Sequence, residues 1–298
     1  MSRAPLERGY ASALAAALIW ALVPVGTRFF VLRIDPYVFN GIRFLASCGA
    51  ALPMFLHARP WRWPRADKLL LLACAVLAVP GYNIPVALGA RSVPAGELGL
   101  LIATEPVMIA ALTLLLHRRT VQRRVVIGSL VAFLGVALTS GVLSGVQSFK
   151  LVSTLQVLSG ALSWSCYTVL AGPLNKRYGT FAATGAIIVV GSLALFALSW
   201  PMFDANLWPD RANVLVITAM GLSSSLLGFL LWNYAGARVP TERLGLFLYL
   251  IPVVSVFVGT QFLEEALSVP ILLGGVLIVM GVWIASRASR QLDMIANP

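Results

Sequence analysis

One acidic residue, Glu105, lies deep inside a long apolar run of the sequence. An ionised carboxylate in a membrane is costly unless it is paired or protonated, so an acid at this depth is a candidate functional group. It could bind substrate or exchange protons. Two structural interpretations stay open. Glu105 could pair with Arg28 or Arg43, or its protonated carboxyl could bond the carbonyl that Pro106 frees.

Prolines also fall inside apolar runs that are long enough to be helices, among them Pro24, Pro85, Pro106 and Pro252. Proline removes a backbone donor and clashes with the preceding turn, so each one is expected to kink its helix and free a carbonyl. In lipid, that carbonyl needs a partner from a side chain, another helix or cavity water. We interpret the four as hinges or cavity bends, with plain packing as the alternative: Pro24, Pro85, Pro106 and Pro252.

Aromatic and amide side chains gather near these prolines. Tyr82 precedes Pro85 by three residues and Trp20 precedes Pro24 by four, so each pair shares a helix face. The alternative is an interfacial belt of Trp and Tyr, which suits residues at run ends, such as Trp63, better. The predicted substrate-binding residues are Trp20, Tyr82, Asn83, Glu105, Trp164, Tyr167, Trp232, Asn233 and Tyr249.

Arg28 and Arg43 lie a few turns from one end of their runs. Long basic side chains can snorkel to the membrane surface, and we expect both residues to do so. A sugar-phosphate substrate would require a cluster of inward Lys or Arg. With both arginines near one end, the sequence does not predict that cluster.

Other chemistries lack their motifs. The sequence contains no G-x-x-x-x-G-K-[ST] phosphate loop and no G-x-S-x-G elbow. Its two histidines, His57 and His117, both lie in basic ends of apolar runs and cannot form a metal cluster. The three cysteines lie in apolar runs without C-x-x-C spacing. We therefore expect no enzymatic activity, catalytic residue, metal or cofactor.

The elements that position these residues follow from the composition. Of 298 residues, 59% are hydrophobic and 11% are charged, against about 25% charged in soluble domains. The chain is therefore predicted to be an all-α membrane protein. Its net charge of +11 comes from short basic clusters between apolar runs. Such clusters indicate membrane topology and contact with anionic lipid rather than a nucleic-acid partner.

Ten runs reach the roughly 20 residues that a spanning helix needs. The first follows a basic start, as in a signal peptide, but it is longer than a signal core, so we expect an uncleaved helix. The predicted spans are about 10–31, 37–56, 67–90, 96–116, 125–143, 152–173, 181–202, 212–236, 244–263 and 269–286.

The chain also contains an internal sequence repeat, so that its two halves resemble one another. Leu98–Val107 recurs as Leu244–Val253, and Gly128 and Gly135 correspond to Gly274 and Gly281, which we interpret as close helix packing. The two five-helix repeats are predicted at 1–150 and 151–298. Five is odd, so the second repeat must be inverted, and Arg118-Arg119 indeed correspond to Glu264-Glu265. The positive-inside rule places both termini in the cytoplasm.

The segment E-P-V-M-I-A-A-L-T-L-L-L-H-R-R-T and its second copy, I-P-V-V-S-V-F-V-G-T-Q-F-L-E-E-A-L-S, carry a family resemblance. Each precedes a helix with spaced glycines, and together they resemble the EamA-type repeat of the drug/metabolite transporter superfamily. Within it, the aromatic residues and the size of the chain resemble those of the YddG-type aromatic amino-acid exporters. The first copy departs from the pattern at His117-Arg118-Arg119. The resemblance implies a ten-helix basket around a central cavity, and transport in the direction of export.

We therefore expect a secondary transporter of the bacterial inner membrane that works by alternating access. An apolar, aromatic cavity with few charges favours aromatic and other hydrophobic amino acids. Lipophilic drugs or other small metabolites are the alternative, and a channel or scaffold subunit is a further one. The expected partners are the amino-acid substrate and membrane lipid, and the chain is expected to act as a monomer.

Overall fold

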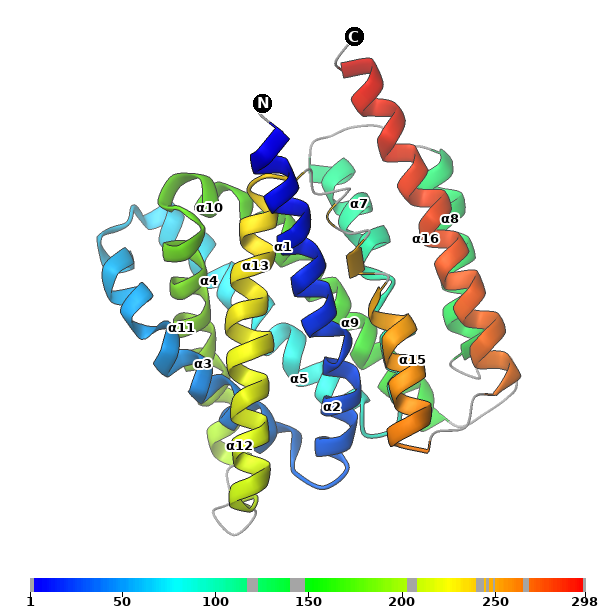
Figure 1. Ribbon diagram of the computed structural model, residues 1–298, viewed down its shortest axis with the longest axis horizontal. Helices are drawn as coiled ribbons and strands as arrows, with labels where there is room; N and C mark the ends of the chain where they lie inside the picture. The colour runs from blue at the N-terminus through cyan, green and yellow to red at the C-terminus, as the bar shows by residue number, and fades with distance from the viewer. Residues whose placement is uncertain are drawn as a thin grey trace.

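The computed structural model describes residues 3–116, 123–139, 148–202, 208–239, 244, 247–248, 250–264 and 268–296. This part of the chain is helical and contains no strand (Figure 1). The α-helices are α1 (Arg3–Ala21), α2 (Val23–Val31), α3 (Pro36–Ala58), α4 (Arg65–Ala78), α5 (Pro80–Gly89), α6 (Ala95–Ile102), α7 (Glu105–Leu116), α8 (Arg123–Thr139), α9 (Ser148–Leu170), α10 (Gly172–Tyr178), α11 (Thr180–Ser199), α12 (Arg211–Met220), α13 (Gly228–Gly236), α15 (Leu250–Phe262) and α16 (Val269–Ala296).

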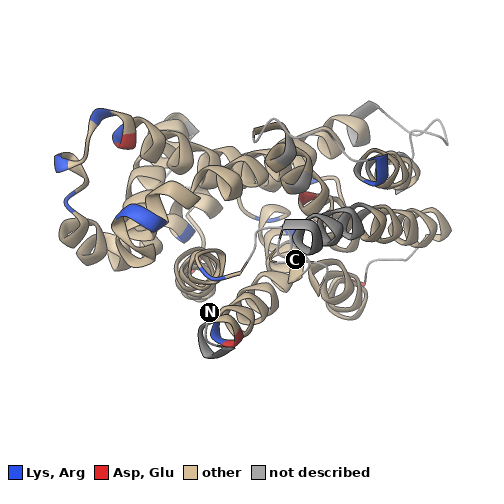
Figure 2. Ribbon diagram, turned by 90° about the horizontal axis from the view of Figure 1, so that it is seen from above, with Lys and Arg blue, Asp and Glu red and all other residues tan. Residues whose placement is uncertain are grey.

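Seven helical runs of the described residues are long and apolar enough to cross a membrane, and three shorter apolar helices accompany them. Large apolar side chains on the outside, such as Leu69, Leu215 and Phe257, are exposed, as lipid-facing residues are. Figure 2 shows that little of the ribbon is charged. The chain is therefore a multi-pass membrane protein. The count of ten spans and the inversion of the second repeat stay predictions.

Several predicted spans are interrupted rather than continuous. The first divides into α1 and α2 at Leu22, the third into α4 and α5 at Val79, and the fourth into α6 and α7 at Ala103–Thr104. The eighth keeps its direction but contains a π-helical turn, Gly221–Leu227, between α12 and α13. Interrupted helices in a membrane are tolerated where they are buried or line a cavity.

Side chains satisfy the carbonyls at these interruptions. Ser255 Oγ on α15 donates to the carbonyl of Ala21, at a distance of 3.1 Å. Asn83 Nδ2 donates to the carbonyl of Val79, at 2.9 Å. Ser163 Oγ on α9 donates to the carbonyl of Leu77, at 3.0 Å. Near the breaks in the first and third spans, side chains therefore bond carbonyls inside the protein, as the low-dielectric surroundings favour.

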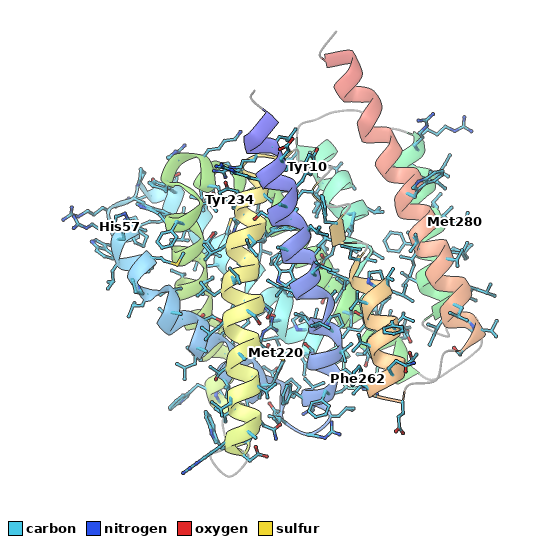
Figure 3. The ribbon with its side chains drawn as sticks, viewed as in Figure 1. Tyr10, His57, Met220, Tyr234, Phe262 and Met280 are labelled. Carbon is cyan, nitrogen blue, oxygen red and sulfur yellow. The ribbon has the colours of Figure 1, made fainter. Side chains whose placement is uncertain are left out.

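The helices pack in pairs that are distant in the sequence. α3 packs on α11, α6 on α15, α1 on α13, α5 on α9 and α8 on α16 (Figure 1). The α8–α16 contact depends on glycine: a Cβ at Gly135 would meet the carbonyl of Gly274, and one at Gly281 would meet that of Gly128. The close packing predicted for these four glycines is therefore confirmed. Figure 3 shows Tyr10 and Tyr234 on the paired helices α1 and α13.

Candidate functional site

A small cavity, with a volume of about 30 Å³, lies among the interrupted helices. Its wall combines side chains from α1, α2, α3, α5, α6, α7, α9, α13 and α15. The lining residues are Trp20, Val23, Pro24, Arg43, Tyr82, Asn83, Ile102, Glu105, Trp164, Phe229, Leu248 and Ile251. An apolar lining with a few convergent polar groups is typical of small-molecule sites, although this cavity would have to widen to hold an amino acid.

Four aromatic rings form one wall of the cavity. The Trp164 ring centroid lies 5.2 Å from that of Trp20, 5.5 Å from that of Tyr82 and 5.0 Å from that of Phe229. Trp20 and Trp164 meet edge to face, an arrangement that aromatic pairs favour. Because the rings touch one another, the empty space between them is narrow. A flat solute could bind here only if the rings or their helices moved apart.

The π-helical turn fixes the position of Trp20. Its indole Nε1 donates to the carbonyl of Ser224, at 2.8 Å. In the π turn, the amide of Gly228 bonds the carbonyl of Ser223 instead of the Ser224 carbonyl that an α-helix would use. The altered pattern leaves the Ser224 carbonyl for Trp20. Gly228 also allows this approach, since a Cβ there would clash with the indole.

The polar part of the wall consists of Arg43, Asn83 and Glu105. The side chain of Arg43 donates to Asn83 Oδ1 at 3.2 Å and to Ser224 Oγ at 3.1 Å, and its Nε has no partner. Glu105 is 2% exposed, and its Oε1 likewise has no partner. A cationic guanidinium and an unpaired carboxyl group therefore face one apolar cavity.

The expectation that Arg43 snorkels is wrong, because its side chain is buried, with 4% of its surface exposed, and lines the cavity. Arg28 has a different environment. Its Nη1 donates to the carbonyls of Ala90 and Arg91, each at 2.7 Å, where α5 ends. Neither arginine forms an ion pair with Glu105 in the described structure, and no side-chain bond from Glu105 to a freed carbonyl is found there.

Five of the nine predicted substrate-binding residues line the cavity: Trp20, Tyr82, Asn83, Glu105 and Trp164. Trp232 lies behind this wall, with its ring centroid 5.2 Å from that of Trp20. Tyr249 lies outside the described residues.

Tyr167 and Asn233 belong to a buried polar network outside the lining. Tyr167 Oη and Asn175 Nδ2 donate to Asn233 Oδ1 at 3.0 and 3.1 Å, and Asn233 Nδ2 donates to Thr184 Oγ1 at 3.0 Å. This network joins α9, α10, α11 and α13. Its hydrogen bonds satisfy most of the polar atoms involved, so it holds the helices together at this level.

The predicted hinge prolines differ in position. Pro24 and Pro106 lie within the first two residues of α2 and α7, directly after a helix break. Pro252 is the third residue of α15 and packs on Gly99 of α6. Pro85 lies inside α5, whereas the break in that span occurs at Val79, before Pro80. Pro80 explains this break because it cannot donate the hydrogen bond that would continue α4.

Sequence reasoning missed Arg43, Phe229 and the apolar lining residues. Arg43 did carry a signal, because an arginine within an apolar run is a functional candidate by default. Phe229 carried none, because it is one of many apolar residues in its span. In the described residues, no three His, Cys, Asp or Glu side chains come together, so no metal site is assigned there.

A second cluster joins α4 to α10 at one end of the bundle. Asp67 accepts hydrogen bonds from Arg177 and Tyr178, and it forms an ion pair with Arg177. The Tyr178 ring stacks on Trp63, with centroids 3.7 Å apart. Trp63 is buried, so the belt interpretation is wrong for this residue.

An apolar groove adjoins the cavity toward the opposite end. It is lined by parts of α2, α12, the π turn and α15, including Phe29, Met220 and Phe262. The groove and the cavity share Val23. Figure 3 shows Met220 and Phe262 well below Tyr10 and Tyr234. The cavity is therefore bordered by a groove on one side and by the polar network and Trp232 on another.

Comparisons with known proteins give the family. The EamA-like transporter family matches the chain twice, over residues 7–141 and 152–287. A solved crystal structure that is 20% identical superposes with a TM-score of 0.68, covering 98% of this chain and 100% of that one. That likeness shows the fold.

Relatives in other organisms are similar over most of their length. An uncharacterized transporter of Archaeoglobus fulgidus is 24% identical over 268 residues, which are 90% of this chain and 95% of the relative. A probable terminal-alkyne amino-acid exporter of Streptantibioticus cattleyicolor is 28% identical over 276 residues, 91% of this chain and 92% of the relative. The uncharacterized transporter YetK of Bacillus subtilis is 24% identical over 94% of this chain and 87% of the relative. With both parts of its sequence matched, this chain belongs to the EamA-like transporter family.

Proposed function

We propose that this transporter exports aromatic and other hydrophobic amino acids across the bacterial inner membrane by alternating access. The observation that carries the proposal is the composition of the cavity wall. Trp20, Tyr82, Trp164 and Phe229 supply aromatic surface, while Asn83 and Glu105 supply buried polar groups beside it. An aromatic side chain would bind against the rings, and the amino-acid head would bind the polar groups.

The energetics favour a flat hydrophobic solute. A ring that stacks on an aromatic wall gains about 0.5–1.5 kcal/mol for each well-placed pair beyond the burial of its surface. A sugar phosphate is disfavoured because the cavity contains one arginine and no lysine. The amino-acid part of the proposal is supported by the Streptantibioticus relative, which is described as a probable amino-acid exporter. The preference for aromatic side chains comes from the cavity itself.

The direction and orientation are part of the proposal. Basic residues dominate the loops on one predicted side, which supports cytoplasmic termini. The marked ends of the chain lie at the same end of the bundle in Figure 1. In this orientation the apolar groove lies in the outer half and adjoins the cavity at Val23. The Asp67–Arg177 cluster then lies at the cytoplasmic end. Substrate released from the cavity would leave through the groove.

Alternating access is supported by the helix pairing. If helices of the second repeat correspond to those of the first, a two-fold relation exchanges the α5–α9 contact with the α1–α13 contact. The same relation maps the α6–α15 and α8–α16 contacts onto themselves. Two halves related in this way can rock against one another around a central site. Pro106 and Pro252 occupy corresponding positions near the contact between α6 and α15.

Replacing Pro106 or Pro252 with alanine is therefore expected to reduce the transport rate severalfold without loss of folding. Alanine restores a backbone donor, so the helix can extend toward the break and stiffen the proposed hinge. Initial uptake rates in proteoliposomes measure the effect, with Pro209→Ala, outside the spans, as a matched control. Wild-type rates in both hinge variants would remove these prolines from the mechanism.

The proposed function is tested by growth and by transport. A bacterial host that expresses the protein is expected to tolerate toxic phenylalanine or tryptophan analogues better than a host with an empty vector. Purified protein in liposomes should then exchange labelled phenylalanine. Liposomes that move a lipophilic cationic dye but no amino acid would support the drug alternative instead. A flux that does not saturate with substrate would indicate a channel.

A further inference from the structure

Arg43 presents a positive charge in the cavity and forms no ion pair with a carboxylate of the described residues. Its guanidinium stays protonated in proteins and offers five donors in a planar fork. Here it contacts only neutral acceptors, Asn83 Oδ1 and Ser224 Oγ, and its Nε has no partner. A buried charge is stable only when it is paired and its donors are satisfied. An anionic group from outside the protein would complete this site.

The position of Arg43 is fixed from several sides. Its backbone carbonyl lies so close to Gly221 that a Cβ at that position would clash with it, which sets α3 directly against the π turn. Ser47 Oγ donates to the carbonyls of Arg43 and Gly221 at 3.0 and 2.9 Å. The guanidinium is therefore held at the cavity by a rigid frame. A preorganised cation of this kind suits recognition of a carboxylate, to which arginine binds with two parallel hydrogen bonds.

Glu105 provides a carboxyl group in the same cavity. Its Oε1 is buried and has no partner, and it forms no ion pair with Arg43. Tyr82 and Asn83 of α5 line the same wall. If these two charges served only to neutralise one another, direct contact would be the favourable arrangement. The cationic guanidinium, together with an unpaired carboxyl that can ionise when an ammonium group binds, instead provides complementary poles for a zwitterion.

We propose that Arg43, assisted by Asn83, binds the carboxylate of the transported amino acid, while Glu105 binds its ammonium group. This inference rests on the proposed function and specifies its selectivity. The aromatic wall would accept the side chain, and the two charges would require both ends of the amino-acid head. Amines and carboxylic acids with the same aromatic group would then be weak substrates, because each leaves one buried charge unpaired.

Competition in proteoliposomes tests the proposal with the full-length protein. Labelled L-phenylalanine is exchanged in the presence of unlabelled L-phenylalanine, of L-phenylalaninamide, which lacks the carboxylate, or of 3-phenylpropanoate, which lacks the ammonium. For the wild type, each analogue should require at least a roughly tenfold higher concentration than phenylalanine for half inhibition, as an interaction of about 1.4 kcal/mol predicts. Wild-type liposomes that exchange no phenylalanine would contradict the proposed function itself.

Variants of Arg43 test whether this residue binds the carboxylate of the amino acid. In Arg43→Gln the advantage of phenylalanine over its amide should disappear, while the advantage over 3-phenylpropanoate persists. Arg43→Lys should keep part of the discrimination because it keeps the charge. Arg62→Gln, which removes a positive charge at an exposed position outside the cavity, is the matched control and should keep the wild-type ratio. An Arg43→Gln protein that still discriminates against the amide overturns the assignment, even if phenylalanine is transported. If Arg43→Gln does not fold, the wild type decides, since equal inhibition by phenylalanine and its amide would also overturn it.

Discussion

Replacement of Glu105 with glutamine is expected to lower amino-acid exchange at least tenfold, which corresponds to about 1.4 kcal/mol of lost interaction. Glutamine has almost the same shape but cannot carry a negative charge or a transferable proton. Glu105 is buried at the cavity, and its Oε1 has no protein partner. The carboxylate therefore has no evident structural partner to lose. Its function would be to hold an ammonium group or to exchange a proton.

The stability of the same variant separates this role from a structural one. Removing a buried acid that lacks a partner should leave the melting temperature unchanged or raise it, because the desolvation cost of the carboxyl disappears. The melting temperature in detergent should therefore stay the same or rise, while the exchange rate in proteoliposomes falls. Glu264→Gln, at an exposed position outside the spans, is the control. A fully active Glu105→Gln protein would make Glu105 a structural residue.

A dependence on the proton gradient distinguishes the two functional roles of Glu105. If the residue exchanges protons, wild-type uptake should respond to an imposed pH gradient, and Glu105→Gln uptake should not. If it only binds ammonium, the gradient should have little effect on either protein. In the second case, the variant should still lose affinity for phenylalanine.

The helical spans could be predicted from the sequence because membrane burial imposes a strong length and composition requirement. The predicted span 67–90, for example, corresponds to α4 and α5 together. The position of the helix break inside that span could not be predicted from the sequence. Pro80 and Pro85 both lie in it, and either could have broken the helix. The break occurs at Pro80, where Ser163 and Asn83 are available to bond the carbonyls of Leu77 and Val79. That choice depends on tertiary contacts.

Arg43 shows how depth can be misjudged from a sequence. It lies seven residues after Pro36, where α3 begins, so about 10 Å of helix separates it from that end. That distance is long for a snorkelling side chain, and the turn of α3 directs it inward. The π turn is harder still to foresee, because Gly221–Leu227 has no periodicity that separates π from α structure. Yet this turn holds Ser224 against both Trp20 and Arg43.

The aromatic residues were predicted in part for a similar reason. Trp20 and Trp164 lie well inside their spans and line the cavity. Tyr167 lies three residues after Trp164 on the same helix face, but its hydroxyl bonds Asn233 and the ring is fully buried. Sequence spacing places residues on a face. It does not give the depth at which that face meets a cavity rather than another helix.

Replacement of Trp164 with alanine is expected to have the second large effect, because this ring is central to the aromatic wall. It contacts Trp20, Tyr82 and Phe229 on the cavity side, and Tyr167 behind it with centroids 4.9 Å apart. Loss of a buried aromatic ring costs about 3–5 kcal/mol of folding stability in a packed core. The loss of folding stability should be smaller here, since one side of the ring borders a cavity rather than packed atoms.

Because stability and binding change together in Trp164→Ala, the experiment needs Trp164→Phe as its matched variant. Phenylalanine keeps an aromatic face at this position and should retain most of the exchange activity and the melting temperature. Trp164→Ala should lose the growth advantage on toxic phenylalanine analogues and most of the exchange of labelled phenylalanine. One outcome is an alanine protein that is folded in detergent and exchanges leucine and phenylalanine equally well. That result would show that the aromatic wall gives the wild type its preference for aromatic side chains. Undiminished preference for phenylalanine in that protein would show that the selectivity lies elsewhere, because the central ring of the wall would then be dispensable.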